Sequence, residues 1–257
     1  MQTFWRDSTV EVVLAPDKLA ALAHHADVAA TTLWLTSVEL LIRRLGVATA
    51  TILSMDKPYR QVRAQQTGET LVVYQAYRPE IASSALEAGR FSDGFNRDRM
   101  TWIKPSFLWM MYRSGWAQKQ GQEMVLAIEI SKSGFEWALG NSALSHFDRS
   151  IHEDLNEWRT SLGGPVRVQW DPERDIRLDK MNYRSLQVGL SGPAVDMYCD
   201  DWIVSIEDRT ELAHELLRLT RAGEYKAAEI LLPDESPYLL PASINSRIGV
   251  TSVIGSD

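Results

Sequence analysis

Cationic and aromatic side chains are interleaved from Arg97 to Trp116 more densely than a core helix or a surface helix requires. The segment reads RDRMTWIKPSFLWMMYRSGW. Its cations and main rings are Arg97, Arg99, Lys104, Arg113, Trp102, Trp109, Tyr112 and Trp116. Cations form charge-assisted hydrogen bonds with phosphate, and ring faces stack on nucleobases. The segment is therefore a candidate for a half-buried platform beside an anionic ligand.

Lys104 directly precedes Pro105, which marks the start of a predicted helix that ends at Gly115. Proline is favoured in the first turn of a helix, where the backbone N–H groups lack partners and the helix dipole favours an anion. We expect Lys104 to bind a phosphate or pyrophosphate there, together with Arg97 and Arg99 just upstream. In the alternative interpretation, Lys104 faces water and the two arginines pair with nearby aspartates.

The rings of this segment divide into two kinds. Residues 107–111 are apolar nearly all round the predicted helix, which is typical of a buried helix and favours core packing for Trp109. Trp102 lies among polar residues and is the better candidate for stacking on a ligand ring, with Tyr112 as a second candidate. If all the tryptophans belong to the core, the protein is a structural or partner-binding domain.

Residues 71–89, LVVYQAYRPEIASSALEAG, predict a strand that runs directly into a helix with proline first and glycine last. Gln75, Tyr77 and Arg78 stand near the end of the strand, where ligand sites are common. A glutamine offers both a donor and an acceptor, which suits an amide such as nicotinamide. The same side chains are equally suited to satisfying neighbouring backbone groups.

Several well-known motifs do not occur in the sequence. The HExxH and CxxC spacings are missing, so neither a zinc enzyme nor a metal cofactor is expected. GxGxxG, GxxxxGK[ST] and GxSxG are missing too. Cys199 is the single cysteine and follows apolar residues, which favours a core thiol. One cysteine also excludes an intrachain disulfide, as in proteins of a reducing compartment.

The charge of the chain is uneven. The 257 residues are 45% hydrophobic and 24% charged, and the net charge of −7 argues against bulk binding of nucleic acid. Residues 57–120 nevertheless carry ten Lys or Arg and five Asp or Glu, a net +5, against −12 elsewhere. A basic centre in an acidic chain fits a local phosphate or nucleotide site. A chance cluster on a solvated face is an equal alternative.

No targeting or membrane segment is expected. The N-terminus lacks the charged-then-apolar order of a signal peptide. The longest apolar stretch, Val28 to Ile42, is interrupted by Glu39 and is too short to span a bilayer. We therefore expect a cytoplasmic protein without a membrane partner, and the sequence leaves its oligomeric state open.

Three segments are predicted along the chain. Residues 1–55 predict a small strand–helix–helix appendage, residues 56–233 the main domain, and residues 234–257 an irregular tail. Within the main domain we expect a hairpin around Thr67-Gly68 and a turn at residues 171–174, DPER. Short strands with irregularly spaced helices favour an α+β fold, with one main mixed, mostly antiparallel sheet and flanking helices.

The main domain resembles the family named domain of unknown function 4291 over residues 57–240. The resemblance rests on long, ordered, tryptophan-rich runs. These are YQAYRPEIASSALEAGRF, DRMTWIKPSFLWMMYRSGW, EMVLAIEIS, GFEWAL, LSHF, VRVQWDPERD and YRSLQVGLSGPAV…YCDDWIVSIED. The family name implies no activity, and residues 1–55 fall outside the resemblance.

The order of elements is also similar to that of ADP-ribosyltransferase folds. VVYQAYRPEIASSALEAG matches their first strand and helix, and SLQVGL matches their late strand. This resemblance implies NAD as a substrate, with Gln75 where a His or Arg is expected and Gln187 where the catalytic Glu often sits. A glutamine cannot act as a carboxylate toward an oxocarbenium-like centre.

We therefore expect an ADP-ribosyltransferase-like enzyme that binds NAD and modifies a nucleic acid or nucleotide. The expected cofactor-binding residues are Gln75, Arg78, Arg97, Arg99, Trp102, Lys104 and Tyr112. The expected catalytic residues are Tyr77, Glu129 and Gln187, of which Tyr77 also helps Gln75 to hold the nicotinamide amide. The alternative is a non-catalytic module that binds RNA or a phosphorylated ligand through the basic face.

Overall fold

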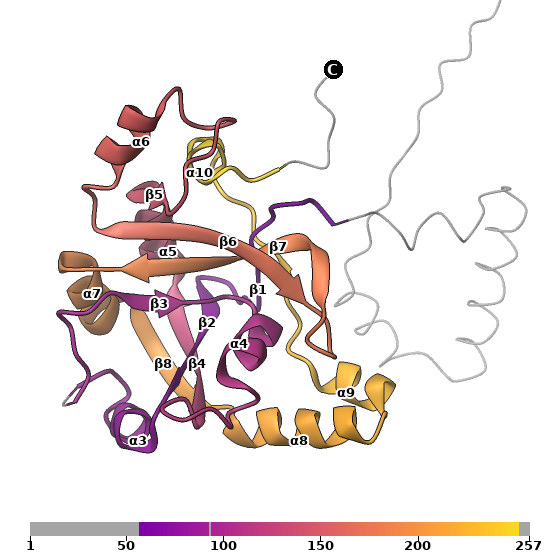
Figure 1. Ribbon diagram of the computed structural model, residues 1–257. Helices are drawn as coiled ribbons and strands as arrows, with labels where there is room; N and C mark the ends of the chain where they lie inside the picture. Colours follow the sequence, from indigo (N-terminus) through magenta and orange to yellow (C-terminus); the bar gives the residue numbers. More distant parts are fainter. Residues whose placement is uncertain (1–56, 93, 252–257) are drawn as a thin grey trace, which may run out of the picture. The chain divides into compact units, whose positions relative to one another are not determined.

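The described part of the chain has two larger β-sheets whose strands run in crossing directions, and a two-stranded sheet of β1, Arg63–Ala64, and β9, Ser236–Pro237 (Figure 1). The computed structural model describes residues 57–92 and 94–251, so the predicted appendage at residues 1–55 lies outside the described residues. The three-stranded sheet has the order β2-β4-β8, with β2 Thr70–Tyr77, β4 Met124–Ser131 and β8 Ile203–Asp208. The four-stranded sheet has the order β3-β7-β6-β5, with β3 Thr101–Ile103, β7 Lys180–Leu190, β6 Val166–Arg174 and β5 Ser142–Leu144.

The predicted α+β class is confirmed, but the prediction of one main sheet is wrong. Pairing is antiparallel within both sheets except between β5 and β6, which are parallel. The sheets meet at a single bridge, in which the Tyr74 N–H donates to the Lys104 carbonyl over 2.7 Å. Pro105 follows at once and has no N–H with which to continue a ladder along β2. On the other side of Lys104, β3 pairs with β7 in the four-stranded sheet.

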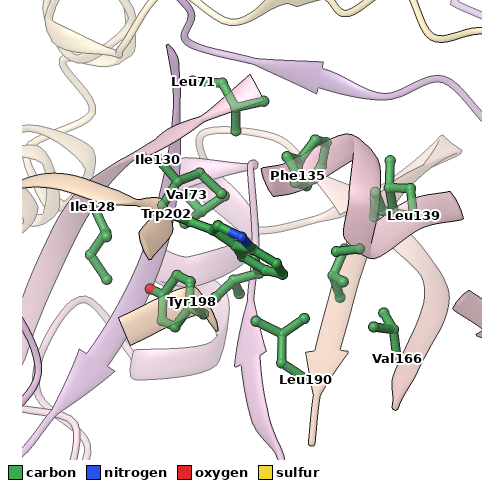
Figure 2. Close-up of a cluster of buried hydrophobic side chains, with 14 of the residues drawn as sticks. Leu71, Val73, Ile128, Ile130, Phe135, Leu139, Val166, Leu190, Tyr198 and Trp202 are labelled. Carbon is green, nitrogen blue, oxygen red and sulfur yellow. The ribbon is translucent and has the colours of Figure 1, made fainter. Parts of the chain in front are cut away.

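The hydrophobic core lies between the sheets, with Trp202 at its centre (Figure 2). Trp202 ends η1, Tyr198–Trp202, a π-helical turn that continues α7, Pro193–Met197. Helix α5, Lys132–Gly140, packs beside it, and a Cβ on its Gly134 would lie 2.4 Å from the Trp202 ring. Only glycine therefore lets the indole approach the helix so closely. Cys199 is buried on the same turn, as the sequence predicts.

The remaining helices surround the sheets. They are α3 Pro79–Ala88, α4 Phe107–Ser114, α6 Leu155–Ser161, α8 Thr210–Arg221, α9 Tyr225–Leu231 and α10 Ala242–Ile248. The predicted proline-first, glycine-last helix is confirmed as α3, with Gly89 left-handed at its end (φ 65°). Among the described residues, no helix has the length and apolar character needed to cross a membrane.

Three local predictions need correction because distant segments decide the pairing. The predicted hairpin is confirmed only at the Thr67-Gly68 turn, where Gln66 bridges Leu71, while β1 pairs with β9. The DPER sequence lies in β6 and only bulges there, as a proline within a strand tends to do. The predicted irregular tail contains β9 and α10, and α10 buries Ile244 and Ile248 in the core.

Candidate functional site

A pocket of about 500 Å³ lies where β2 and β3 meet. Its charged side chains are those of Arg78, Arg99, Lys104 and Arg113. Gln75, Tyr77, Thr101 and Trp102 supply much of its polar and aromatic lining. None of the described residues that line it is acidic. We call this site the cationic pocket, because its chemistry selects an anion.

β3 and the residue after it supply three of the lining side chains. Thr101 is buried beside Gln75, Trp102 is half-buried, and Lys104 is buried, whereas Ile103 packs in the core. Arg78 comes from the β2–α3 junction, and Arg113 from the last turn of α4. The two predicted signals, the β2–α3 unit and the Trp102–Lys104 pair, therefore converge on one site.

Lys104 is the most unusual residue of the pocket. Its side chain is 5% exposed, and its Nζ lies 4.7 Å from the centre of the Trp109 ring. Within the described ranges it has neither an ion pair nor a side-chain hydrogen bond. Burial, together with the smaller effect of the Arg113 charge, lowers the pKa of Lys104 to about 7, and Asp171 opposes the shift. The amine is thus readily deprotonated near neutral pH.

The expected phosphate at the start of the helix is replaced by a carboxyl group of the protein itself. Helix α4 begins at Phe107, and Ser106 caps it by accepting the Trp109 N–H at 3.1 Å. The Phe107 N–H donates to Glu235 Oε1 at 2.6 Å. The interpretation of Pro105 as the first helical residue with free N–H groups is therefore wrong. Glu235 gave no signal in the sequence because it lies in the predicted irregular tail.

Gln75 and Tyr77 line the pocket but are already engaged. The Gln75 amide nitrogen donates to the Tyr77 and Thr101 hydroxyls, each at 2.8 Å, and its oxygen accepts the Tyr198 hydroxyl at 2.8 Å. Gln75 thereby ties β2 to β3 and η1. Burial raises the pKa of Tyr77, so the phenol stays neutral. These contacts fit the alternative in which Gln75 satisfies neighbouring groups.

Four of the predicted site residues do not line the cationic pocket, namely Arg97, Tyr112, Glu129 and Gln187. Arg97 forms two hydrogen bonds with Asp200, at 2.6 and 2.8 Å. The guanidinium of Arg174 lies over the Tyr112 ring, with its Cζ 3.5 Å from the centre of the ring. Glu129 accepts hydrogen bonds from Thr70 and Ser205 between β2, β4 and β8. Each of these three side chains therefore has a structural contact that accounts for it.

Gln187 lies near the pocket on the face of the four-stranded sheet that carries Trp102 and Lys104. Its amide donates to Asp171 Oδ2 at 2.7 Å, and the Gln169 amide donates to Asp171 Oδ1 at 2.8 Å. Both carboxylate oxygens of Asp171 are thus held by glutamine amides. Sequence reasoning missed Asp171 because DPER was interpreted as a turn. The available signal was the alternation of Gln169 and Asp171 along one strand face.

Glycine at position 189 shapes the same sheet face. Gly189 on β7 is the register partner of Trp102 on β3. A Cβ at this position would lie 2.9 Å from the Trp102 ring, so a larger residue would displace the indole. The glycine therefore lets the ring of Trp102 lie against β7, with part of its surface facing the pocket.

A second pocket, of about 250 Å³, lies beside the start of α4. Its ionisable lining residues are Lys57, Arg63, Glu173, Arg174, Tyr183, Asp234 and Glu235. Glu173 accepts hydrogen bonds from the Ser106 hydroxyl at 2.9 Å and the Arg174 N–H at 2.8 Å. Burial raises the pKa of Glu173, and burial together with Glu173 raises the pKa of Glu235 to about 8. We call this site the acid pocket.

Metal binding finds no support in the part of the chain that the structure describes. No group of three His, Cys, Asp or Glu side chains is placed to hold an ion there. Comparison with known proteins adds one finding. The family described as "Domain of unknown function (DUF4291)" matches residues 61–238, which is more than half of the chain. No curated protein matches the chain.

Proposed function

We propose that this chain, which belongs to the family described as "Domain of unknown function (DUF4291)", binds a nucleotide in its cationic pocket, with NAD as the first candidate. One observation carries the proposal. Four cationic side chains line the pocket, and none of its described lining residues is acidic. Guanidinium groups bind phosphate oxygens in a bidentate manner, and the pocket is large enough for part of a dinucleotide.

The arginines differ in how readily they would meet a phosphate. Arg99 and Arg113 are exposed, and neither has an ion pair among the described residues. Arg78 lies 3.6 Å from Glu80, but both side chains are largely exposed, so this pair is weak. We therefore assign the phosphate groups mainly to Arg99 and Arg113. Trp102 would stack on a base or on the nicotinamide ring.

A second candidate function, ADP-ribosyl transfer to a nucleic acid or nucleotide, is supported by Asp171. The two glutamine amides hold its carboxylate on the sheet face that carries Gln187 and Lys104. A fixed carboxylate supplies what Gln187 lacks for an oxocarbenium-like centre. The elements that resemble those of ADP-ribosyltransferases, β2 with α3 and β7, lie on either side of the segment formed by β3 and Lys104.

The affinity for NAD, measured by titration calorimetry, tests the binding proposal. The double substitution Arg99→Gln, Arg113→Gln should weaken binding by roughly 100-fold or more, because each charge-assisted hydrogen bond contributes about 1.5–3 kcal/mol. Arg90→Gln is the matched control, since Arg90 is exposed and lies outside the pocket lining. Equal NAD affinities for the double variant, the control and the unaltered protein would refute the proposal.

Nicotinamide release separates the two candidate functions. Transfer predicts release from NAD that is lost in Asp171→Asn, a substitution that keeps the size of the side chain but removes its charge. Binding without transfer predicts no release. If NAD does not bind and RNA does, with an affinity that falls steeply with salt, the protein is the RNA-binding module of the alternative interpretation.

A further inference from the structure

We propose that Lys104 is a nucleophilic amine that forms an imine with phosphorylated aldehydes or ketones held in the cationic pocket. This inference deepens the proposed function and rests on it, because the same arginines would hold the phosphate. In this proposal Lys104 forms a covalent bond with the ligand, whereas in simple anion binding it would contribute only its positive charge.

The position of Lys104 carries the inference. The side chain is 5% exposed, yet it lines the pocket beside Arg113. No carboxylate among the described residues forms an ion pair with it. A desolvated amine next to another cation favours its neutral form, which is the nucleophilic one. Its lowered pKa, about 7, agrees with this geometry.

Other lysines of the described ranges have ordinary surroundings. Lys132 donates to the Gly68 carbonyl at 2.7 Å, and Lys57 donates to the Tyr183 hydroxyl at 3.0 Å. Lys119 is exposed at the surface. All three of Lys57, Lys104 and Lys132 have their Nζ over an aromatic ring. Lys104 differs in that it is 5% exposed and has no side-chain hydrogen bond among the described residues. It is therefore distinguished by its environment, and Lys119 can serve as an internal reference for reactivity.

The reaction needs no redox partner. The lone pair of neutral Lys104 Nζ attacks the carbonyl carbon, and the carbonyl π electrons move to oxygen. The oxygen takes up a proton from water, and the nitrogen gives one of its protons to the hydroxide so formed, which leaves a neutral carbinolamine. The carbinolamine then loses hydroxide as the nitrogen lone pair forms the C=N bond, and the nitrogen gives its remaining proton to that hydroxide, which becomes water. The products are the imine and one water molecule.

The pocket also defines the substrate class. Phosphate held by Arg99 and Arg113 would fix the ligand, and a carbonyl group elsewhere in the same molecule would meet Lys104. Open-chain sugar phosphates have this composition, and so does ADP-ribose, whose ribose opens to an aldehyde. The charged groups that act on the amine are Arg113 from α4 and Asp171 from β6, with Arg78 and Arg99 also lining the pocket.

Pyridoxal 5′-phosphate, a phosphorylated aldehyde, is a suitable probe. The full chain is incubated with it and treated with borohydride, which reduces an imine to a stable secondary amine, and the labelled peptides are identified by mass spectrometry. We expect labelling of Lys104 at least 10-fold above Lys119. Pyridoxal without phosphate should label Lys104 at least 10-fold less. Labelling should increase from pH 6 to pH 8 as the amine loses its proton.

The Lys104→Arg variant separates the covalent role from the charge. It should retain affinity for pyridoxamine 5′-phosphate, which has no carbonyl, and should lose the adduct. Unmodified protein that binds NAD but gives no Lys104 adduct would overturn the imine inference and leave the proposed function intact. Absence of both NAD binding and the adduct would overturn both. Equal labelling of Lys104 and Lys119 would also contradict the inference.

Discussion

Lys104 and Glu235 line different pockets next to the start of α4, and burial drives both toward their neutral forms. The pKa of Lys104 falls to about 7 beside Arg113, and that of Glu235 rises to about 8 beside Glu173. The two side chains differ in the contacts that offset the cost of burial. Glu235 accepts the Phe107 N–H, whereas Lys104 has no hydrogen-bond partner among the described residues and its Nζ lies over the Trp109 ring. We infer that the acid supports the helix and that the base is available to a ligand.

The largest effect is expected when Lys104 is replaced by an apolar residue of similar length. Because the folded pKa of Lys104 is low, the unfolded chain binds more protons between about pH 7 and pH 10.5, and stability rises with pH across this window. Lys104→Met should therefore raise the free energy of unfolding by about 2–4 kcal/mol at pH 6. The gain should shrink at pH 9, as urea denaturation at the two pH values will show.

A gain that stays the same at both pH values would mean that Lys104 is not buried as a charge. The comparison with Glu235 would then lose its basis, because only one of the two pockets would hold a group forced toward neutrality. Lys119→Met is the control, since an exposed lysine should show neither the gain nor its pH dependence.

A smaller effect of opposite pH dependence is expected for Glu235→Gln. The raised pKa means that the folded state binds more protons between about pH 4.5 and pH 8, so stability falls as pH rises through this range. Glutamine keeps an oxygen for the Phe107 N–H and has no charge to bury. The variant should match the unaltered protein at pH 5 and exceed it by about 1–3 kcal/mol at pH 8. Thermal denaturation at both pH values tests this, and a variant less stable at pH 8 would contradict it.

Ser106→Ala should have the smallest effect on stability. It tests whether the cationic pocket and the acid pocket act independently at the start of α4. Ser106 accepts the Trp109 N–H and donates to Glu173, so it serves both α4 and the acid pocket. Loss of the cap should cost about 1 kcal/mol of stability. NAD affinity should stay unchanged, because Ser106 does not line the cationic pocket. Denaturation and calorimetry measure the two quantities, and a fall in NAD affinity would show that the pockets are coupled.

The sequence allowed prediction of the parts of the site that depend on local order. The α3 helix has its proline and glycine at the expected ends, and Trp102 and Lys104 both line the cationic pocket from β3 and the residue after it. Asp171 and Glu235 could not be found in this way. Asp171 meets Gln187 only through the β6–β7 register, and Glu235 reaches α4 from more than a hundred residues away. Such contacts leave no periodic pattern.

The pairing of β1 with β9 has a consequence for synthesis in the cell. Arg60 and Thr251 are joined by hydrogen bonds across 191 residues of chain. At about 5–20 residues per second, a ribosome needs roughly 10–40 s to make that length. For most of this interval β1 has no partner strand, and α4, once made, lacks the carboxyl group of Glu235 until residue 235 is added. The nascent chain therefore keeps the edge of β1 unpaired until residues 236–237 have been made.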